Sequence, residues 1–346
     1  MRRYMFGLDP ADWRGSAGRL RGLGYDAAVL PPGDEAAFRA AADAGLETWL
    51  CFGAHAIGDF AQREWGAKDA RGDDAPWFDS ACPNAAAVNE RNLGAALAFA
   101  GRVDGLAGVF VDGARFASFA SLEGVASFFG CFCDRCMARM EALGYDARAI
   151  RSGVRALSDH LDGGGGDPAA MRAAVDSWLD FRAACVGDYM AAFAAAARAK
   201  GLRAGAFVFA PSLWRLVGQR PDALIGLDLV APMLYRAYPH PGGPACLSHE
   251  WAALKRLLSR SGRPAEAAAL LGVKLPPGDP MAGFLPARIG SETAAARAQL
   301  PHSVALKPIV QAEDDALDET VDRVLAAGAD GCGEFMYTQK FPRGGR

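Results

Sequence analysis

The chain has 346 residues, of which 51% are hydrophobic and 22% are charged, and its net charge is −3. This length can bury one large core or two modest ones, and the slightly acidic balance provides no basic surface for nucleic acid. No apolar run approaches the roughly 18 residues that a membrane span needs, and the opening stretch MRRYMFGLDP is too short in apolar residues for a signal peptide. We therefore expect a cytoplasmic protein that binds neither nucleic acid nor membranes.

Strand-like and helical segments alternate along the chain. The strand-like runs are apolar and rich in β-branched or aromatic residues, and they span 4–8, 25–30, 47–52, 108–112, 203–209, 227–234, 303–310 and 329–337. Helical patterns between them are clearest at 85–102, 136–156, 167–200, 250–261, 291–300 and 314–327. Eight strands that alternate with helices predict an α/β fold, a single (β/α)₈ TIM barrel over residues 1–346.

An open doubly wound sheet is the competing architecture, but no G-x-G-x-x-G follows the first strand. The two long helical patterns after the fourth strand exceed what one crossover needs, so we expect a helical excursion at 131–175. The chain ends nine residues after Tyr337, which leaves no room for an eighth helix. A homo-oligomer contact over the barrel seam is one way to cover that gap.

The fourth strand ends in the most informative ionisable pair. Its apolar run Gly108–Val111 stops at Asp112, and Arg115 follows three residues later. The carboxyl ends of parallel strands are where barrels keep their chemistry, so we expect Asp112 to be catalytic. We also expect Arg115 to keep Asp112 ionised, which suits a nucleophile or a base. The alternative is that Asp112 caps the following turn or pairs with Arg115.

Glycoside hydrolysis needs two carboxylates, and two further acids follow late strands. Glu334 lies inside an apolar run, where a carboxylate is costly unless it is used or paired, so a buried ion pair is its alternative. Glu313 is the other candidate, although with Asp314 it could instead begin a helix. No nucleophile elbow, H-E-x-x-H, P-loop or dinucleotide fingerprint is present.

Other strand ends and the irregular segment 53–83 supply polar and aromatic residues. A loop of this length inside a compact chain is usually functional. Trp and Tyr rings stack on sugars, and polar groups bind hydroxyls, so a carbohydrate is the expected ligand. The expected sugar-binding residues are Asp9, His55, Trp77, Arg115, Tyr235, Gln311 and Tyr337.

Cysteines predict a metal site. Cys131, Cys133 and Cys136 form C-x-C-x-x-C, so their thiolates can converge, and Cys82 precedes the helix that leads into the fourth strand. Four thiolates would close a tetrahedral zinc site with no open position, which makes the zinc structural. The alternatives are free buried cysteines, an iron–sulfur centre, or a catalytic metal with His55 or water as fourth ligand.

Together, Cys82-Pro83-Asn84, the acid Asp112 and the cluster Cys131 to Cys136 resemble family 42 of the glycoside hydrolases, the β-galactosidases with a (β/α)₈ catalytic barrel. The resemblance covers about residues 77–185 and implies a structural zinc on the four cysteines. The chain also resembles a group of uncharacterised glycosidase-like barrel proteins that pair D-x-x-R-F with C-F-C-x-x-C and carry P-M-x-Y, here Pro232 to Tyr235.

The family's catalytic pattern differs from this chain. Family 42 ends its fourth strand with an Asn-Glu pair, where this chain has Val111-Asp112, and the nearest match to its seventh-strand glutamate is Glu313. The resemblance therefore implies the zinc more strongly than the catalytic residues. We expect a glycoside-hydrolase-like enzyme with Asp112 as nucleophile or base and Glu334 or Glu313 as acid. The alternative is a barrel that binds carbohydrate without hydrolysing it.

Overall fold

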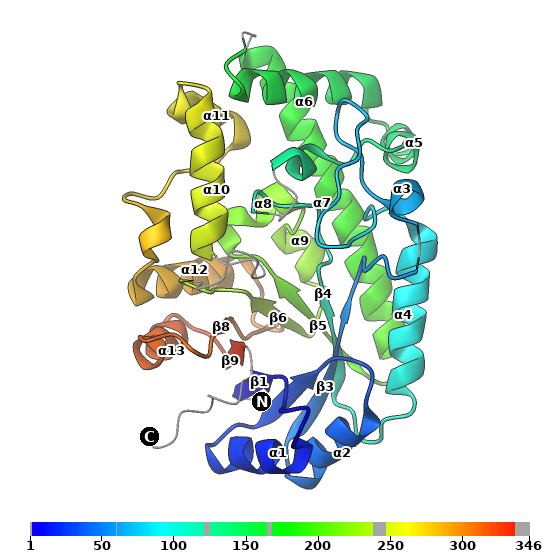
Figure 1. The fold of residues 1–346 in the computed structure, drawn as a ribbon, viewed down its shortest axis with the longest axis vertical. Helices are drawn as coiled ribbons and strands as arrows, with labels where there is room; N and C mark the ends of the chain where they lie inside the picture. The colour runs from blue at the N-terminus through cyan, green and yellow to red at the C-terminus, as the bar shows by residue number, and fades with distance from the viewer. Residues whose placement is uncertain (1, 60, 121–124, 165–167, 238–246, 336–346) are drawn as a thin grey trace.

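The computed structural model describes residues 2–59, 61–120, 125–164, 168–237 and 247–335. Within these residues nine parallel strands form one curled sheet, with the order β7-β6-β5-β4-β3-β2-β1-β9-β8 (Figure 1). The strands are β1 (Arg3–Phe6), β2 (Ala27–Leu30), β3 (Glu47–Gly53), β4 (Gly108–Asp112), β5 (Arg203–Val208), β6 (Leu229–Pro232), β7 (Ala305–Leu306), β8 (Ile309–Gln311) and β9 (Cys332–Phe335). The predicted TIM-barrel-like α/β fold is confirmed.

β7 and β8 are the two halves of one interrupted strand. β7 pairs with β6, whereas β8 pairs with β9. Between them, Pro308 has no amide hydrogen to donate to a neighbouring strand. The amide of Lys307 donates to the Val230 carbonyl at 2.9 Å, and the Pro308 carbonyl accepts from Gly333 at 2.8 Å. The two edges of the curled sheet therefore meet here, and the nine strands correspond to the eight that the sequence predicts.

Aromatic rings fill the interior of the sheet. Phe110 stacks on Phe207 with ring centres 4.5 Å apart, and the Tyr4 ring lies 6.2 Å from Phe110 on its other side. Gly333 faces this layer, because a Cβ added there would lie 2.0 Å from the Tyr4 ring. Side chains alternate across a strand, so an inward Gly333 sends the side chain of Glu334 to the outer face.

Helices cover the outside of the sheet. The α-helices are α1 (Trp13–Gly22), α2 (Glu35–Asp43), α3 (Gln62–Trp65), α4 (Ala86–Ala100), α5 (Asp134–Ala142), α6 (Ala147–Leu161), α7 (Pro168–Arg198), α8 (Trp214–Val217), α9 (Pro221–Leu224), α10 (Leu247–Arg260), α11 (Pro264–Leu271), α12 (Pro286–Gln299) and α13 (Leu317–Ala326). Short 3₁₀ turns lie at η1 (Val125–Phe129), η2 (Pro211–Leu213) and η3 (Pro280–Ala282). No helix in the described ranges is long and apolar enough to cross a membrane.

The helical excursion expected after the fourth strand is present as α5, α6 and α7. The buried side chains Ile150, Val154, Leu157 and Leu161 recur at helical spacing along α6, and α6 packs on α7. Figure 1 shows α5 and α6 at the opposite end of the molecule from α1 and α2. The chain after Phe335 lies outside the described residues, so the missing eighth helix and the oligomer contact over the seam stay predictions.

Candidate functional site

A pocket of about 240 Å³ opens at the carboxyl ends of neighbouring strands. Its lining includes Gly53 at the end of β3, Asp112 at the end of β4 and Met233 just after β6. Four of the predicted site residues line it together: Asp112, Arg115, His55 and Trp77. The pocket therefore lies where barrel enzymes place their active sites.

Asp112 is a carboxyl group with restricted access to water. Its Oδ1 accepts the amide of Gly113 at 2.7 Å. Burial raises the pKa of Asp112 above its ordinary range, although the Arg115 charge and the Gly113 amide oppose the increase. Desolvation therefore acts against the Arg115 charge, which the sequence analysis expects to keep Asp112 ionised. A carboxyl that retains its proton to higher pH is suited to donate one.

Arg115 is enclosed by aromatic rings. Its guanidinium carbon lies 4.3 Å from the ring centre of Phe209 and 4.7 Å from that of Trp77. Nη1 donates to the carbonyl of Phe116 at 3.0 Å. These contacts hold the guanidinium in one orientation at the pocket wall.

His55 is held as a neutral imidazole. Its Nδ1 lies 2.8 Å from Oδ1 of Asn89, and the Asn89 amide nitrogen donates to the carbonyl of Pro83 at 2.8 Å. Because that bond fixes the amide so that its oxygen faces the ring, we assign the hydrogen to Nδ1 and leave Nε2 as the acceptor. Burial lowers the pKa of His55 to about 4. The ring can therefore accept a hydrogen bond from a ligand at neutral pH.

The segment 53–83 folds back so that its two ends meet at the pocket. The amide of Ala81 donates to the His55 carbonyl at 2.7 Å, and Ala56 pairs with Ser80. Between these contacts, Phe78 and Asp79 have φ values of 46° and 48°, a left-handed conformation that is rare for residues other than glycine. The turn brings the buried Trp77 into the same wall as His55.

The four cysteines of the predicted metal site come together. The sulfur atoms of Cys82, Cys131, Cys133 and Cys136 all lie within 4.8 Å of one another, and all four residues are buried. Cys131 precedes α5, Cys133 caps it, and Cys136 lies one turn into it, whereas Cys82 approaches from the end of segment 53–83. Hydrogen bonds from the neighbouring thiols Cys131, Cys136 and Cys82 lower the pKa of Cys133, so the cluster favours a thiolate.

The donor set fits a tetrahedral metal ion. A zinc ion with Zn–S bonds of about 2.3 Å separates its sulfur ligands by about 3.8 Å. Here Cys82 Sγ lies 3.3 Å from Cys136 Sγ and 3.6 Å from Cys133 Sγ. The Asn84 side chain donates to Cys136 Sγ at 3.2 Å, and its backbone amide donates to Cys82 Sγ at 3.4 Å, as expected for ligands that carry negative charge. The cluster could therefore bind a metal.

Comparison with solved structures finds similar folds at low identity. The catalytic domain of β-amylase from Paenibacillus polymyxa is 13% identical with a TM-score of 0.52, and the match covers 97% of this chain and 92% of that one. The glycoside hydrolase domain of PgaB (BpsB) from Bordetella bronchiseptica is 13% identical with a TM-score of 0.51, and the match covers 99% of this chain and 96% of that one. A β-galactosidase from the psychrophilic Marinomonas ef1 is 10% identical with a TM-score of 0.55, covering 97% of this chain and 54% of that one.

These similarities show the fold. The fold is a TIM barrel like those of glycoside hydrolases. The sequence itself matches no protein-family model and no curated protein. The resemblance to family 42 therefore stays a prediction that is based on the cysteine pattern.

Glu334 lies away from the pocket at Asp112. It is 1% exposed on the outer side of β9, where Oε1 accepts from Arg3 Nε at 2.9 Å and Oε2 accepts from the Tyr25 hydroxyl at 2.6 Å. Arg3 begins β1 and Tyr25 precedes β2, so this pair lies toward the amino ends of the strands. Both carboxylate oxygens are engaged there, and Glu334 is not among the pocket residues. We therefore do not retain it as the partner acid; its environment is the buried ion pair given as its alternative.

Among the described residues, the other predicted site residues Glu313, Gln311, Tyr235 and Asp9 do not line the pocket. Glu313 is exposed after β8, and Gln311 is buried at the end of that strand. Tyr235 packs its ring on Phe335 at 5.2 Å, and Asp9 Oδ1 accepts the amide of Ala11 at 2.9 Å in a local turn. Tyr337 lies outside the described residues.

Glu250 is a buried carboxyl group that the sequence analysis missed. It lies on α10, where Oε1 accepts from the Ser118 hydroxyl at 2.7 Å and Oε2 accepts from the Ala120 amide at 3.1 Å. Burial raises its pKa, and its charge is close enough to stabilise that of Arg115. The available signal was its spacing, because Glu250 falls on the same helical stripe as Leu247 and Leu254.

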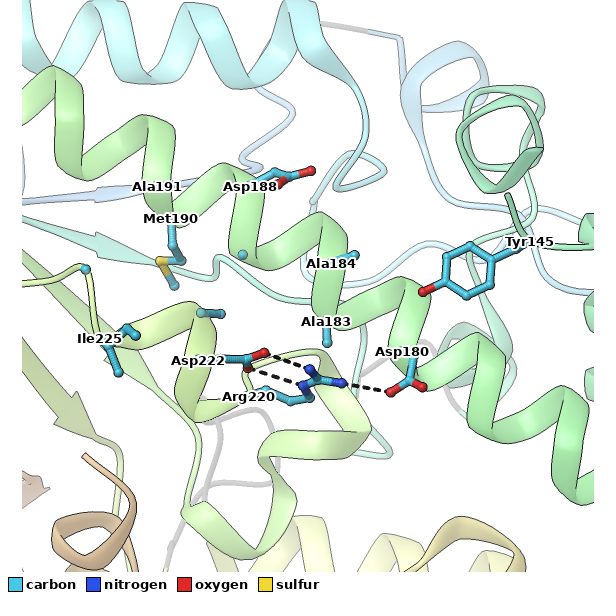
Figure 2. A pocket seen from close by; sticks show the side chains of 13 residues that line it. Tyr145, Asp180, Ala183, Ala184, Asp188, Met190, Ala191, Arg220, Asp222 and Ile225 are labelled. Carbon is cyan, nitrogen blue, oxygen red and sulfur yellow. Dashed lines mark hydrogen bonds and ion pairs between the residues drawn. The ribbon is translucent and has the colours of Figure 1, made fainter. Parts of the chain in front are cut away.

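A second cavity, of about 590 Å³, lies in the helical layer and includes none of the predicted site residues (Figure 2). It runs between α7 and α9. Arg220 lies in its wall and pairs with Asp180 at 2.8 Å and with Asp222 at 2.7 Å. Its lining is otherwise mostly small side chains, such as Ala184 and Gly187. This cavity lacks the buried titratable groups that mark the pocket at Asp112.

Proposed function

We propose that the protein is a glycoside-hydrolase-like enzyme that acts on a carbohydrate in the pocket at Asp112. One observation carries the proposal: the protonatable carboxyl of Asp112 shares a pocket with the Trp77 ring and the neutral imidazole of His55. The volume of about 240 Å³ is below the roughly 300–1,000 Å³ of sites for drug-sized ligands, so it suits one sugar unit. The glycoside hydrolase neighbours support the fold that this chemistry uses.

In this proposal each pocket residue has one role. Asp112 donates its proton to the glycosidic oxygen as the bond to the leaving sugar breaks. His55 accepts a hydrogen bond through Nε2 from a hydroxyl of the sugar or from the attacking water. Trp77, which is buried in the pocket wall beside Arg115, contributes to the apolar lining around the sugar. The raised pKa of Asp112 favours the role of acid over the nucleophile or base expected from the sequence.

A barrel that binds sugar without hydrolysing it is the second candidate. The observation in its favour is that Asp112 alone among the described lining residues carries a carboxyl group. Glycosidases of most families use two carboxylates that flank the bond. Binding needs only the aromatic and polar groups that the pocket already holds.

We also propose that the cysteine cluster holds a structural zinc ion. The sulfur spacings support this, and four thiolates leave no position for water or substrate. When bound, zinc supplies a rigid junction between the start of α5 and the end of segment 53–83. His55 bonds to Asn89 and does not belong to the cluster, which argues against the catalytic-metal alternative.

Hydrolysis of a panel of aryl glycosides tests the function. The panel is assayed with the wild type, with Asp112→Asn, and with Glu334→Gln as a matched carboxyl-to-amide control away from the pocket. Turnover that falls about a hundredfold or more in Asp112→Asn and stays near wild type in Glu334→Gln supports the hydrolase. Equal turnover in all three proteins removes Asp112 from the mechanism. Sugar binding without any turnover selects the second candidate.

A further inference from the structure

Arg115 carries a buried charge without an ion pair among the described residues. Its side chain is 6% exposed, and a guanidinium stays protonated in proteins. Nη1 bonds to the carbonyl of Phe116, the next residue, while Nε is buried and has no partner. A buried charge without a counter-ion is costly, so this arginine indicates that the pocket binds an anionic ligand.

The two nearest carboxyl groups do not meet this requirement. Both attract Arg115 through space, but Asp112 Oδ1 accepts the Gly113 amide, and the two oxygens of Glu250 accept from Ser118 and Ala120. Neither forms a contact ion pair with the guanidinium in the described part of the chain.

Arg220 shows the contrast within the same molecule. It lines the cavity in the helical layer, and two aspartates neutralise it: Asp180 accepts from one guanidinium nitrogen and Asp222 from the other two (Figure 2). An arginine with two such partners needs no anionic ligand. The guanidinium of Arg115 packs against aromatic rings, whereas carboxylates bind the guanidinium of Arg220.

On the basis of the function proposed above, we propose that the sugar bound in this pocket is a sugar acid, a uronic acid unit whose carboxylate binds to Arg115. A guanidinium presents a planar fork of donors that matches the two oxygens of a carboxylate. The rings of Trp77 and Phe209 hold that fork in place before the ligand arrives, which reduces the entropy lost on binding. The pocket accommodates one such unit.

Calorimetric titration of the full chain with free sugars tests the inference. D-glucuronate and D-galacturonate are compared with D-glucose, D-galactose and D-glucuronamide. The amide keeps the ring and the size of glucuronate but removes the charge. Free sugars contain both anomers in solution, so the unknown anomer does not matter. We expect at least one uronate to bind about tenfold or more tightly than its neutral counterparts, the range of a hydrogen bond to a charged group.

Variants locate the effect. Arg115→Gln should lose the preference for the uronate, Arg115→Lys should keep part of it, and Arg220→Gln should bind as the wild type does. If an Arg115 variant fails to fold, the comparison of glucuronate with glucuronamide on the wild type still decides the question.

Four results would overturn the inference. Equal binding of glucuronate and glucuronamide shows that the carboxylate is not recognised. Binding of D-glucose 6-sulfate as tight as that of the uronates shows an anion site that does not select a carboxylate. Cleavage of neutral aryl glycosides without uronate binding refutes the inference and leaves the proposed function intact, whereas no sugar binding at all refutes both.

Discussion

Arg182 donates a hydrogen bond to the carbonyl of Gly130, the residue that precedes Cys131. Its side chain is fully buried and also donates to the carbonyls of Phe128 and Leu216, the latter at 2.6 Å. Phe128 and Gly130 lead into the cysteine cluster, whereas Leu216 lies on α8 after β5. The Arg182 guanidinium therefore links the segment before the cysteine cluster to the segment that follows β5.

Arg182→Met should destabilise the protein strongly. The substitution leaves three carbonyls without their charged donor, and we expect the free energy of unfolding to fall by about 3 kcal/mol or more. Urea denaturation measures the change. Arg220→Met, which removes an arginine at the surface with two ion pairs, should cost no more than about 1 kcal/mol. Equal losses in the two variants would contradict the role assigned to Arg182.

Cys133→Ser should abolish metal binding. Elemental analysis of the purified wild type should find about one zinc ion per chain, and the variant should contain almost none and unfold at lower temperature. Cys332→Ser is the matched control, because Cys332 is buried on β9 and its sulfur donates to the Gly333 carbonyl instead of joining the cluster. Zinc retained in full by Cys133→Ser would exclude the four-thiolate site.

His55 should make the protein sensitive to mild acid. Its folded-state pKa of about 4 lies below the ordinary value of about 6.5, so the unfolded chain takes up a proton first as the pH falls. Stability is therefore intact above pH 6.5 and is lost progressively down to about pH 4, by up to about 3 kcal/mol. Urea denaturation at several pH values should show a shallower decline for His55→Gln. The same decline in both proteins would show that the imidazole is not buried as described.

Glu334→Gln should affect stability and leave sugar binding unchanged. The substitution removes the negative charge beside Arg3 and one acceptor of the ion pair, for an expected loss of about 2 kcal/mol or more. Arg3→Met combined with Glu334→Gln should lose less than the two single changes added together, since both remove the same interaction. Weaker sugar binding in Glu334→Gln would return this residue to the list of site candidates.

The sequence predicts the barrel because its strands are buried on both faces and read as continuous apolar runs. The break at Pro308 is not predicted, because the run 303–310 reads as one strand, although a proline inside such a run signals an interruption. The sequence also does not predict that the Glu334 side chain lies on the outer face of the sheet. That depends on Gly333 lying against Tyr4, a contact between the two most distant strands of the chain.

Local signals identify four of the residues that line the pocket. Asp112 and Arg115 follow a strand, and His55 and Trp77 lie in a long loop, so chain position alone brings them to one end of the barrel. The raised pKa of Asp112 cannot be predicted in this way, because desolvation depends on side chains from several separate segments. Glu250 lies on α10, so neither a position at a strand end nor a place in the loop 53–83 identifies it.

β1 pairs with β9, although 329 residues separate Arg3 from Cys332. A ribosome adds about 5–20 residues per second, so β1 leaves it some tens of seconds before its neighbour exists. Throughout that interval β1 presents a row of unpaired amides and carbonyls, and Arg3 lacks Glu334. The nascent chain thus carries an open strand edge during nearly all of its synthesis, and chaperones that shield such edges should engage it early.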